Sequence, residues 1–540
     1  MLKKILYRLE TTILGGAIIV GFASVLSRLV GLIRDRLLAS TFGAGEVLDV
    51  YYAAFRLPDF IFNIFVLGAL SASFIPVFLE YWHRDQSKPE VERQAWPMTN
   101  SILNLIAITL IILGGLMWLF TPQLMGIIAP GFSPEKKAAT ALLTRIMLVS
   151  IVFFGVSNVL SGILNSFRRF FVYSLAPIMY NFGIIFGILV LAPHWGVKGL
   201  AYGVVIGSFA HLVVQWPAAR RVGFVYKWIF DTAHAGVRKI GRLMIPRALS
   251  LGVVQINQVV INVLASNLGT GSVAVFNLAN NLQSFPIGVF GISLAISSFP
   301  VFSKAWAEND RDGFVRHFSE TFRRILFLII PVSVGILLLR AQFVRIILGA
   351  GAFDWNDTIL TAQTLGFFSL SLFAQSLAPM LTRSFYAFQN TKTPVIISLI
   401  SMAMNIGLGI WLSQRWGIYG LALAFSISSV VNTLLLLIAL RVVVGDLDER
   451  RILRSTLKII VATIAMGAIV QLMKYFIATG VNMQTFLGIA LQTSIAFVAG
   501  VIAYIIIAYV LHCEEISALR QWLDKAKRLF QRNGQSTNYE

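Results

Sequence analysis

The sequence predicts an all-α integral membrane protein with about fourteen transmembrane helices. Of its 540 residues, 57% are hydrophobic and only 13% are charged, and the mean hydropathy is +0.78. Soluble globular chains carry about a quarter charged residues, so this chain has too few polar side chains to cover a surface in water. Its apolar residues fall into long runs, and its basic residues gather in every second connection between those runs. Lipid is therefore the predicted solvent for most of the chain.

Fourteen apolar runs are long enough to cross a bilayer. A helix needs about 20 mostly apolar residues to span a hydrocarbon core of about 30 Å, whereas a strand of a membrane barrel would alternate over about ten residues. The predicted spans are 13–38, 48–79, 97–121, 138–166, 170–192, 197–218, 243–268, 272–302, 321–341, 358–388, 393–413, 417–441, 455–478 and 484–511.

Lysine and arginine predict the orientation of these spans. With the amino terminus inside, the inner segments hold thirty of these residues and the outer segments hold nine. Cytoplasmic connections of membrane proteins carry an excess of Lys and Arg. Both termini are therefore predicted to be cytoplasmic, and the net charge of +20 reflects topology and not a nucleic-acid partner.

Internal repeats predict two homologous halves of six spans each. The segment LASTFGAGEV at 38–47 recurs as LASNLGTGSV at 264–273, and two further blocks recur in the same order at nearly the same shift. An even number of spans returns the chain to the same side, so the halves are parallel repeats, a design in which transporters place the substrate between the repeats. The predicted parts are an N-terminal lobe, a C-terminal lobe, an appended pair of helices and a tail, at 1–225, 226–445, 446–512 and 513–540.

The tail at 513–540 is expected to form an amphipathic helix on the cytoplasmic side. Ile516, Leu519, Leu523 and Phe530 fall on one side of it, and its basic residues fall largely elsewhere. This pattern is typical of a helix that lies in the membrane interface.

Motifs for nucleotide, metal and redox chemistry are missing. The sequence contains no G-x-x-x-x-G-K-[ST] segment, and its glycine-rich segments lack the third glycine of a dinucleotide fingerprint. Its single cysteine, Cys513, excludes a disulfide framework and a Cys-based zinc site, and its six histidines do not stand at metal-ligand spacing. We therefore expect a transporter and not an enzyme, with no catalytic residues, no bound metal and no cofactor.

Polar residues recur at helical spacing inside the first, second, seventh and eighth spans. Lipid penalises such residues, so they are expected to face a partner or a water-filled cavity. At 1.5 Å per residue, Arg28 lies ~9 Å deeper than Arg34, and an unpaired arginine at the bilayer centre costs at least ~2.5 kcal/mol. The four spans occupy equivalent places in the two halves, which predicts one central cationic chamber. Its predicted binding residues are Ser27, Arg28, Arg34, Asp49, Arg56, Arg247, Asn277, Asn280 and Asn281.

These charges allow two interpretations. Arg34 with Asp35 or Asp49, and Arg56 with Asp59, could be structural ion pairs within the protein. A chamber rich in arginine and amides would instead suit an anion, because a guanidinium group matches phosphate with two parallel hydrogen bonds.

The anion is favoured at Arg28 and Arg247, which have no carboxylate at helical spacing within their spans. A cationic drug would need carboxylates, and none lies between 243 and 306.

Two blocks carry a family resemblance. The segment SRLVGLIRDRLLASTFGAGEVLDVYYAAFRLPD at 27–59 closely resembles the MurJ/MviN family of lipid II flippases, within the multidrug/oligosaccharidyl-lipid/polysaccharide exporter superfamily. The segment SLAPMLTRSFYAFQNTKTP at 376–394 resembles that family's tenth span. The resemblance covers about 10–445, and a fourteen-helix plan also suits the family. It implies a bacterial inner-membrane protein that moves undecaprenyl-pyrophosphate-linked disaccharide-pentapeptide outward by alternating access, without ATP and in dependence on membrane potential.

Residue by residue, the resemblance implies roles for three positions and departs at two. The family's first-span arginines match Arg28 and Arg34, and its acidic residue at the start of the second span matches Asp49. Where the family typically has further arginines in the second and eighth spans, this chain has Phe62 and Asn281. We infer from the residues, and not from the family, that Arg247 or Arg56 replaces the missing charge.

The favoured hypothesis is therefore a lipid II flippase, with lipid II and membrane lipids as partners, cell-wall synthesis proteins as candidate partners, and no nucleic acid. Three alternatives stay open. The chain could flip another polyprenyl-pyrophosphate-linked saccharide, it could exchange drugs for cations through a membrane carboxylate such as Asp49 or Asp59, or it could be an inactive scaffold that recruits cell-wall enzymes.

Overall fold

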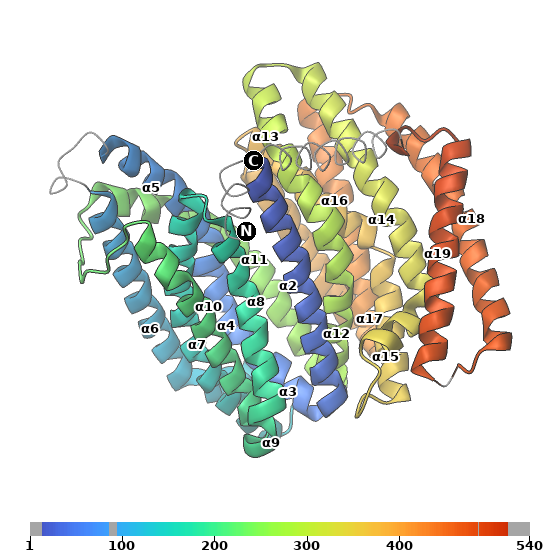
Figure 1. Cartoon of the computed structure of the whole chain (residues 1–540), viewed down its shortest axis with the longest axis horizontal. Coiled ribbons are helices and arrows are strands. Elements are labelled where there is room, and N and C mark those ends of the chain that lie inside the picture. The colour runs from blue at the N-terminus through green and yellow to red at the C-terminus, as the bar shows by residue number, and fades with distance from the viewer. Residues whose placement is uncertain (1–12, 86–93, 484, 517–540) are drawn as a thin grey trace, which may run out of the picture. The chain divides into compact units, whose positions relative to one another are not determined.

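The described part of the chain is helical throughout. The structure, a computed structural model, describes residues 13–85, 94–483 and 485–516, and gives the backbone alone at 13–18, 67–72, 246–247 and 249–250. Within these residues it contains helices and no strand (Figure 1). The all-α fold class predicted from the apolar runs is confirmed. The predicted interfacial helix within 513–540 lies outside the described residues, except for 513–516.

Most helices are long, and three contain π-helical segments (η). In chain order they are α2 (Ile13–Phe42), α3 (Glu46–Ala54), α4 (Arg56–Ile61), η1 (Phe62–Leu70), α5 (Ser71–Asp85), α6 (Ala95–Ile128), α7 (Pro134–Ser166), α8 (Phe170–Phe186), η3 (Gly187–Leu191), α9 (Ala192–Trp195), α10 (Val197–Arg221), α11 (Ala235–Ser266), α12 (Ser272–Pro286), η4 (Ile287–Ile292), α13 (Ser293–Ala307), α14 (Arg311–Ile347), α15 (Trp355–Ser369), α16 (Leu372–Ala387), α17 (Lys392–Val444), α18 (Glu449–Gly480) and α19 (Phe486–Val510).

The predicted spans coincide with these helices. Length and composition alone identify nine helices of the described chain that could each cross a membrane, or ten if the bent pair α15 and α16 forms one span. The remaining predicted spans fall on α2, on the broken run from α3 to α5, on α11 and on the second arm of α17. The total of fourteen therefore stays a prediction.

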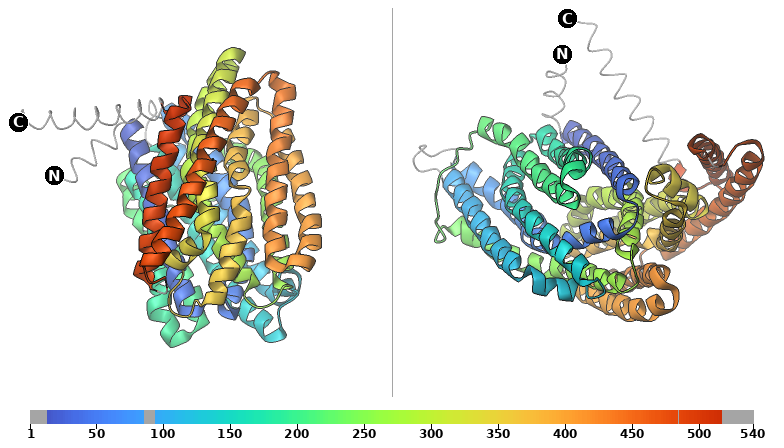
Figure 2. Two further views of the ribbon diagram at one scale, coloured as in Figure 1. Left: turned by 90° about the vertical axis from the view of Figure 1, so that its right-hand side faces the viewer. Right: turned by 90° about the horizontal axis from the view of Figure 1, so that it is seen from below.

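Helix α17 consists of two arms joined at a sharp turn. Gly417 has φ 56° and ψ −135°, a conformation that only glycine adopts readily. The arms return alongside each other in both views of Figure 2, where they are orange, and the Ser401 hydroxyl donates to the Ser428 carbonyl at 2.8 Å. The two predicted spans, 393–413 and 417–441, therefore correspond to the two arms of α17, which are separate helices joined by a hairpin bend at Gly417.

The chain forms two compact units that alternate along the sequence. The first comprises Met1–Leu278, Ile347–Asp357 and Ile406–Leu421, and the second comprises Ala279–Ile346, Thr358–Asn405 and Ala422–Glu540. The division of the sequence at 225 and 445 follows the repeat and stays a prediction.

In the first unit, aromatic side chains fill the space between α5, α6 and α7. The Phe78 ring stacks on Trp82 with centroids 6.1 Å apart, and it also contacts Trp96 and Phe167. Each aromatic ring buries about 150–250 Å², so this cluster is a large contribution to packing at one end of the unit.

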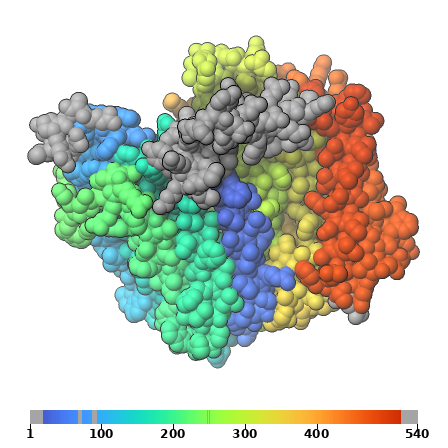
Figure 3. All heavy atoms as spheres, in the orientation of Figure 1, coloured from blue at the N-terminus to red at the C-terminus, as the bar shows by residue number. Residues whose placement is uncertain are grey.

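In the second unit, α18 and α19 pack side by side (Figure 2), and Figure 3 shows their atoms, in orange to red, at the surface. Ile464, Leu472 and Phe476 of α18 and Leu487 and Ile506 of α19 are each more than half exposed. Soluble proteins rarely expose apolar patches of this size. The surface fits the predicted contact with lipid.

Close contact of α8 and η3 with α10 depends on glycine. A Cβ atom at Gly203 would lie 2.6 Å from the Gly187 Cα, and one at Gly183 would lie 2.1 Å from the Gly207 Cα. Small residues at such positions let helix backbones approach in a membrane, where packing takes the place of the hydrophobic effect.

Substitution of Gly203 by alanine is expected to destabilise the protein by about 1–3 kcal/mol, because the new methyl group meets backbone that cannot move aside. The measurement is the thermal midpoint of the purified protein in detergent. Gly115 of α6 is the matched control, since a Cβ there would have no atom within 4 Å. A Gly115→Ala variant that loses as much stability as Gly203→Ala would contradict this account.

Candidate functional site

The predicted polar stripe of the first span lies on α2, where Arg34 is held on two sides. Its guanidinium group pairs with Asp35 at 2.7 Å and donates to the Asn181 side-chain oxygen on α8 at 3.0 Å. Asp35 is buried, and Arg34 keeps about a fifth of its side chain exposed. The sequence analysis offered Asp35 or Asp49 as a structural partner of Arg34, and the pair with Asp35 is confirmed.

Asn181 also fixes the neighbouring turn of α2. Its side-chain nitrogen donates to the Pro177 carbonyl at 3.1 Å and to the Ser27 carbonyl at 3.5 Å. The two donations point the side-chain oxygen of Asn181 toward Arg34, since an amide has one acceptor end and one donor end. Arg28 lies next to Ser27 on the same helix and is half-buried.

The second arginine of the site, Arg56, begins α4 at a break in the second predicted span. Helix α3 ends at Ala54, and Pro58 occupies the first turn of α4, where a missing backbone N–H costs little. The Arg56 guanidinium donates to the side-chain oxygens of Asn262 on α11, at 3.2 Å, and Asn277 on α12, at 2.7 Å.

The partners of Arg56 orient it without cancelling its charge. Asn262 donates to the Ile128 carbonyl and Asn277 donates to the Val273 carbonyl, so each amide presents its oxygen to the guanidinium. Within the described residues no hydrogen bond or direct ion pair joins Arg56 to Asp59, but the two charges attract each other across one turn of α4. The hydrogen-bond acceptors around Arg56 are therefore neutral amides, and the predicted pair with Asp59 is a longer-range attraction and not a direct contact.

Asp49 is fully buried in a third set of contacts, at the end of the unit where α2 meets α3. One carboxylate oxygen pairs with Lys136 of α7 at 2.7 Å and accepts from the Gly271 backbone N–H at 2.7 Å. The other accepts from the Ala274 backbone N–H at 2.8 Å. These backbone groups open α12, so Asp49 acts as a helix cap supplied from another part of the chain, where a negative charge also favours the helix dipole.

Further contacts join distant segments at the same end of the first unit. The Ala352 N–H donates to the Ser40 carbonyl at 2.7 Å, and the Ala44 N–H donates to the Asp357 carboxylate at 2.8 Å. A Cβ at Gly351 would lie 2.2 Å from the Ser40 carbonyl oxygen. Segments from both predicted halves of the chain are thus locked together here.

The remaining predicted residues are Asn280, Asn281 and Arg247. Asn280 and Asn281 belong to the second unit, where Asn280 accepts from Gln283 at 3.0 Å and Gln283 accepts from Gln375 at 3.0 Å. The side chain of Arg247 lies outside the described residues.

The position where a family arginine is missing is apolar in the structure. The Phe62 ring lies against Phe154 of α7, with centroids 4.9 Å apart. In the described chain, no group of three His, Cys, Asp or Glu side chains is arranged to hold a metal ion.

Sequence reasoning missed Asn181 and Lys136 as members of the site and did not select Asn262. Asn181 is a single amide in an apolar span, one turn after Pro177. This position in the sequence was the signal that could have identified it as a member of the site. Lys136 lies in a predicted outer connection, where a basic residue has no evident partner. Asn262 stands on the polar stripe of its span, but only the structure shows that it contacts Arg56.

The comparisons with known proteins agree with this geometry. The family model for lipid II flippase MurJ matches residues 38–491, more than four-fifths of the chain. A probable lipid II flippase MurJ from Bdellovibrio bacteriovorus is 27% identical over 516 residues, which cover 94% of this chain and 97% of that protein. The corresponding protein from Rickettsia prowazekii is 29% identical over 425 residues, which cover 78% and 82%.

Solved structures match as well. A structure described as lipid II flippase MurJ in an inward closed conformation is 26% identical, with a TM-score of 0.75 over 92% of this chain and all of that one. An inward-facing multidrug transporter of the MATE family, at 17% identity and a TM-score of 0.64, shares the fold. With the family model matched over most of its length, the chain belongs to the lipid II flippase MurJ family.

Proposed function

We propose that this chain is a lipid II flippase that moves undecaprenyl-pyrophosphate-linked peptidoglycan precursor from the inner to the outer leaflet by alternating access, without ATP. Its family makes it a multi-pass membrane transporter and not a catalytic enzyme. The observation that carries the proposal is Arg56, a cation among apolar helices that is bound by neutral amides and not by a carboxylate. Such a group attracts an anion into a low-dielectric site.

The pyrophosphate would engage arginines of the first, second and seventh spans. Arg34 forms a direct ion pair with Asp35, whereas Arg56 hydrogen-bonds neutral amides and meets Asp59 only through a longer-range attraction. Arg28 and Arg247 complete the proposed cationic set. Phosphate oxygens would replace the amide oxygens of Asn262 and Asn277 at Arg56, because an anionic acceptor adds charge attraction and can take two parallel hydrogen bonds from the guanidinium group. The freed Asn277, with Asn280 and Asn281, would then be available to the sugar and peptide head group.

The contacts of Asp49 favour a role in closing the outer end of the transport path, and not a role in binding the substrate. In the predicted orientation, α2 ends and α3 begins on the outer side. Asp49, Lys136 and the start of α12 would have to separate before a head group could leave there. We therefore assign Asp49 to this closure, in place of the direct substrate contact expected from the sequence.

The remaining expectations follow from the same proposal. Both termini lie in the cytoplasm and the protein sits in the bacterial inner membrane. The membrane potential resets the carrier, and cell-wall synthesis proteins are the class of protein partner.

Replacing Arg56 or Arg28 by alanine is expected to reduce lipid II translocation at least about tenfold, because each substitution removes a charge-assisted contact worth about 1.5–3 kcal/mol. The measurement is lipid II translocation in cells depleted of their own flippase and supplied with this chain. Arg145→Ala is the matched control, since Arg145 is also within a span but lies over the Trp118 ring at 4.6 Å, outside the site. Translocation that tolerates both site substitutions would remove the proposed role.

Replacing Asp49 by alanine is expected to lower stability by about 3–5 kcal/mol, because Lys136 is then left buried without its counter-charge. The change is measured as the thermal midpoint of the purified protein. Glu46→Ala, which removes an exposed acid from the same helix, should change it little. Adding Lys136→Met to Asp49→Ala should restore part of the loss, and strictly additive effects would show that the pair is not coupled.

A further inference from the structure

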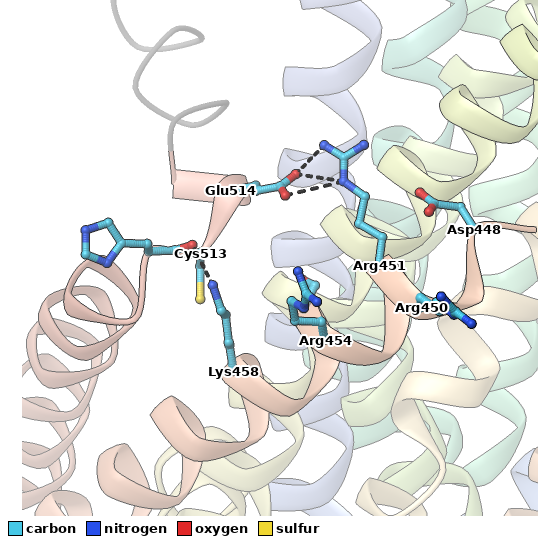
Figure 4. Close-up of a pocket in the computed structure, with 9 residues that line it drawn as sticks. Asp448, Arg450, Arg451, Arg454, Lys458, Cys513 and Glu514 are labelled. Carbon is cyan, nitrogen blue, oxygen red and sulfur yellow. Dashed lines mark hydrogen bonds and ion pairs between the residues drawn. The ribbon is translucent and has the colours of Figure 1, made fainter.

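A basic pocket opens in the second unit, and none of the residues that line it is assigned to substrate. It lies between the first turns of α18 and the segment that follows α19, with a volume of about 290 Å³. Figure 4 shows Arg451, Arg454 and Lys458 along α18, beside the segment that carries Cys513 and Glu514. Arg450 also lines the pocket.

The cations of this pocket exceed its anions. Arg451 and Glu514 form an ion pair at 2.6 Å and offset each other, and burial of that pair is small. Asp448 accepts from Ser319 at 2.7 Å. Arg450 and Arg454 are exposed and make no side-chain hydrogen bond or ion pair with any described residue. Two guanidinium groups are therefore available to a ligand.

The Glu514 carboxylate already forms ion pairs with arginines of the protein. It also pairs with Arg323 at 3.1 Å, and the hydrogen bond from Arg451 holds the pKa of Glu514 below its usual value. A ligand anion would thus meet Arg450 and Arg454 with little competition from this acid.

An exposed apolar stripe continues from the pocket along α18. Leu453, Leu457, Val461 and Ile464 are between 52% and 67% exposed and recur every three or four residues. At 3.6 residues per turn they share a side of the helix with Arg450. The stripe ends ~21 Å from Arg450 along the axis, comparable to the depth of one leaflet with its interface.

We propose that this pocket binds the phosphate headgroup of an anionic membrane phospholipid, whose acyl chains lie along the apolar stripe of α18. Guanidinium groups bind phosphate in a bidentate manner, and basic pockets at the cytoplasmic end of membrane helices suit anionic headgroups. In the predicted orientation, this end of α18 meets the inner leaflet. The site is separate from the proposed lipid II site, because all of its residues lie at the ends of the appended helices.

The test compares lipid binding by the purified full-length protein and its variants. Phosphatidylglycerol is the probe, phosphatidylcholine is the zwitterionic comparison, and inorganic phosphate represents the headgroup chemistry alone. Native mass spectrometry gives the dissociation constants, and thermal midpoints without added lipid show that each variant is folded. The test variant is Arg450→Gln with Arg454→Gln. The control is Arg220→Gln with Arg221→Gln, which removes two exposed arginines from the end of α10, also on the predicted inner side.

The wild-type protein is expected to retain phosphatidylglycerol in preference to phosphatidylcholine. The test variant should bind phosphatidylglycerol roughly tenfold more weakly, because it loses charge-assisted hydrogen bonds to phosphate. The control variant should stay within about twofold of wild type, because distant surface charges are screened.

Three results would overturn the proposal. One is equal weakening in both variants, which would indicate non-specific attraction. Another is inorganic phosphate competing as well as the lipid does, which would indicate a site for a free anion. The last is a greater loss of lipid II affinity than of phosphatidylglycerol affinity in the test variant, which would assign the pocket to the transported substrate. Failure of the flippase proposal is seen separately, in the translocation assay of Arg28→Ala and Arg56→Ala.

Discussion

A cation inside an apolar helix bundle must have hydrogen-bond partners, but its charge must not be balanced by an acid in direct contact, if it is to bind an anion. Arg34 and Arg56 show two different outcomes. Arg34 meets a carboxylate one residue away and becomes part of a neutral pair. Arg56 meets two amide oxygens, each held in place by a second hydrogen bond to a backbone carbonyl. Burial of a charge is tolerated when it is hydrogen-bonded, and amides supply those bonds while the positive potential remains.

The acidic residues follow the complementary rule. Asp49 is removed from water but accepts from two backbone N–H groups and pairs with a lysine, so all of its main acceptor directions are used inside the protein. The cation-binding capacity of a drug antiporter would require a carboxylate with free acceptors. Asp35 and Asp49 are both paired with cations of the protein itself, and Asp59 interacts with the charge of Arg56. Each of these three acids therefore has a cation of the protein as its electrostatic partner, which favours an anionic substrate over a cationic one.

The sequence was sufficient for the class of fold, because a lipid environment imposes long apolar runs that need no tertiary information. It was also sufficient for which spans carry polar faces. The partners of those polar residues could not be read from it. Arg56 donates to residues 206 and 221 positions away, whereas its nearest acid in the sequence, Asp59, makes no hydrogen bond with it. Asp49 caps a helix that begins 222 residues later, so its role depends on the folded arrangement and not on local spacing.

Helix α12 belongs to both compact units, since the boundary between them falls after Leu278, one residue beyond Asn277. The π-helical turn η4 follows α12, and its backbone hydrogen-bond ladder is weaker than that of an α-helix. Asn277, which accepts from Arg56, therefore stands near both a unit boundary and a soft stretch of backbone. Loss of its hydrogen bond to Arg56 on arrival of an anion would remove a restraint from the part of α12 that belongs to the first unit.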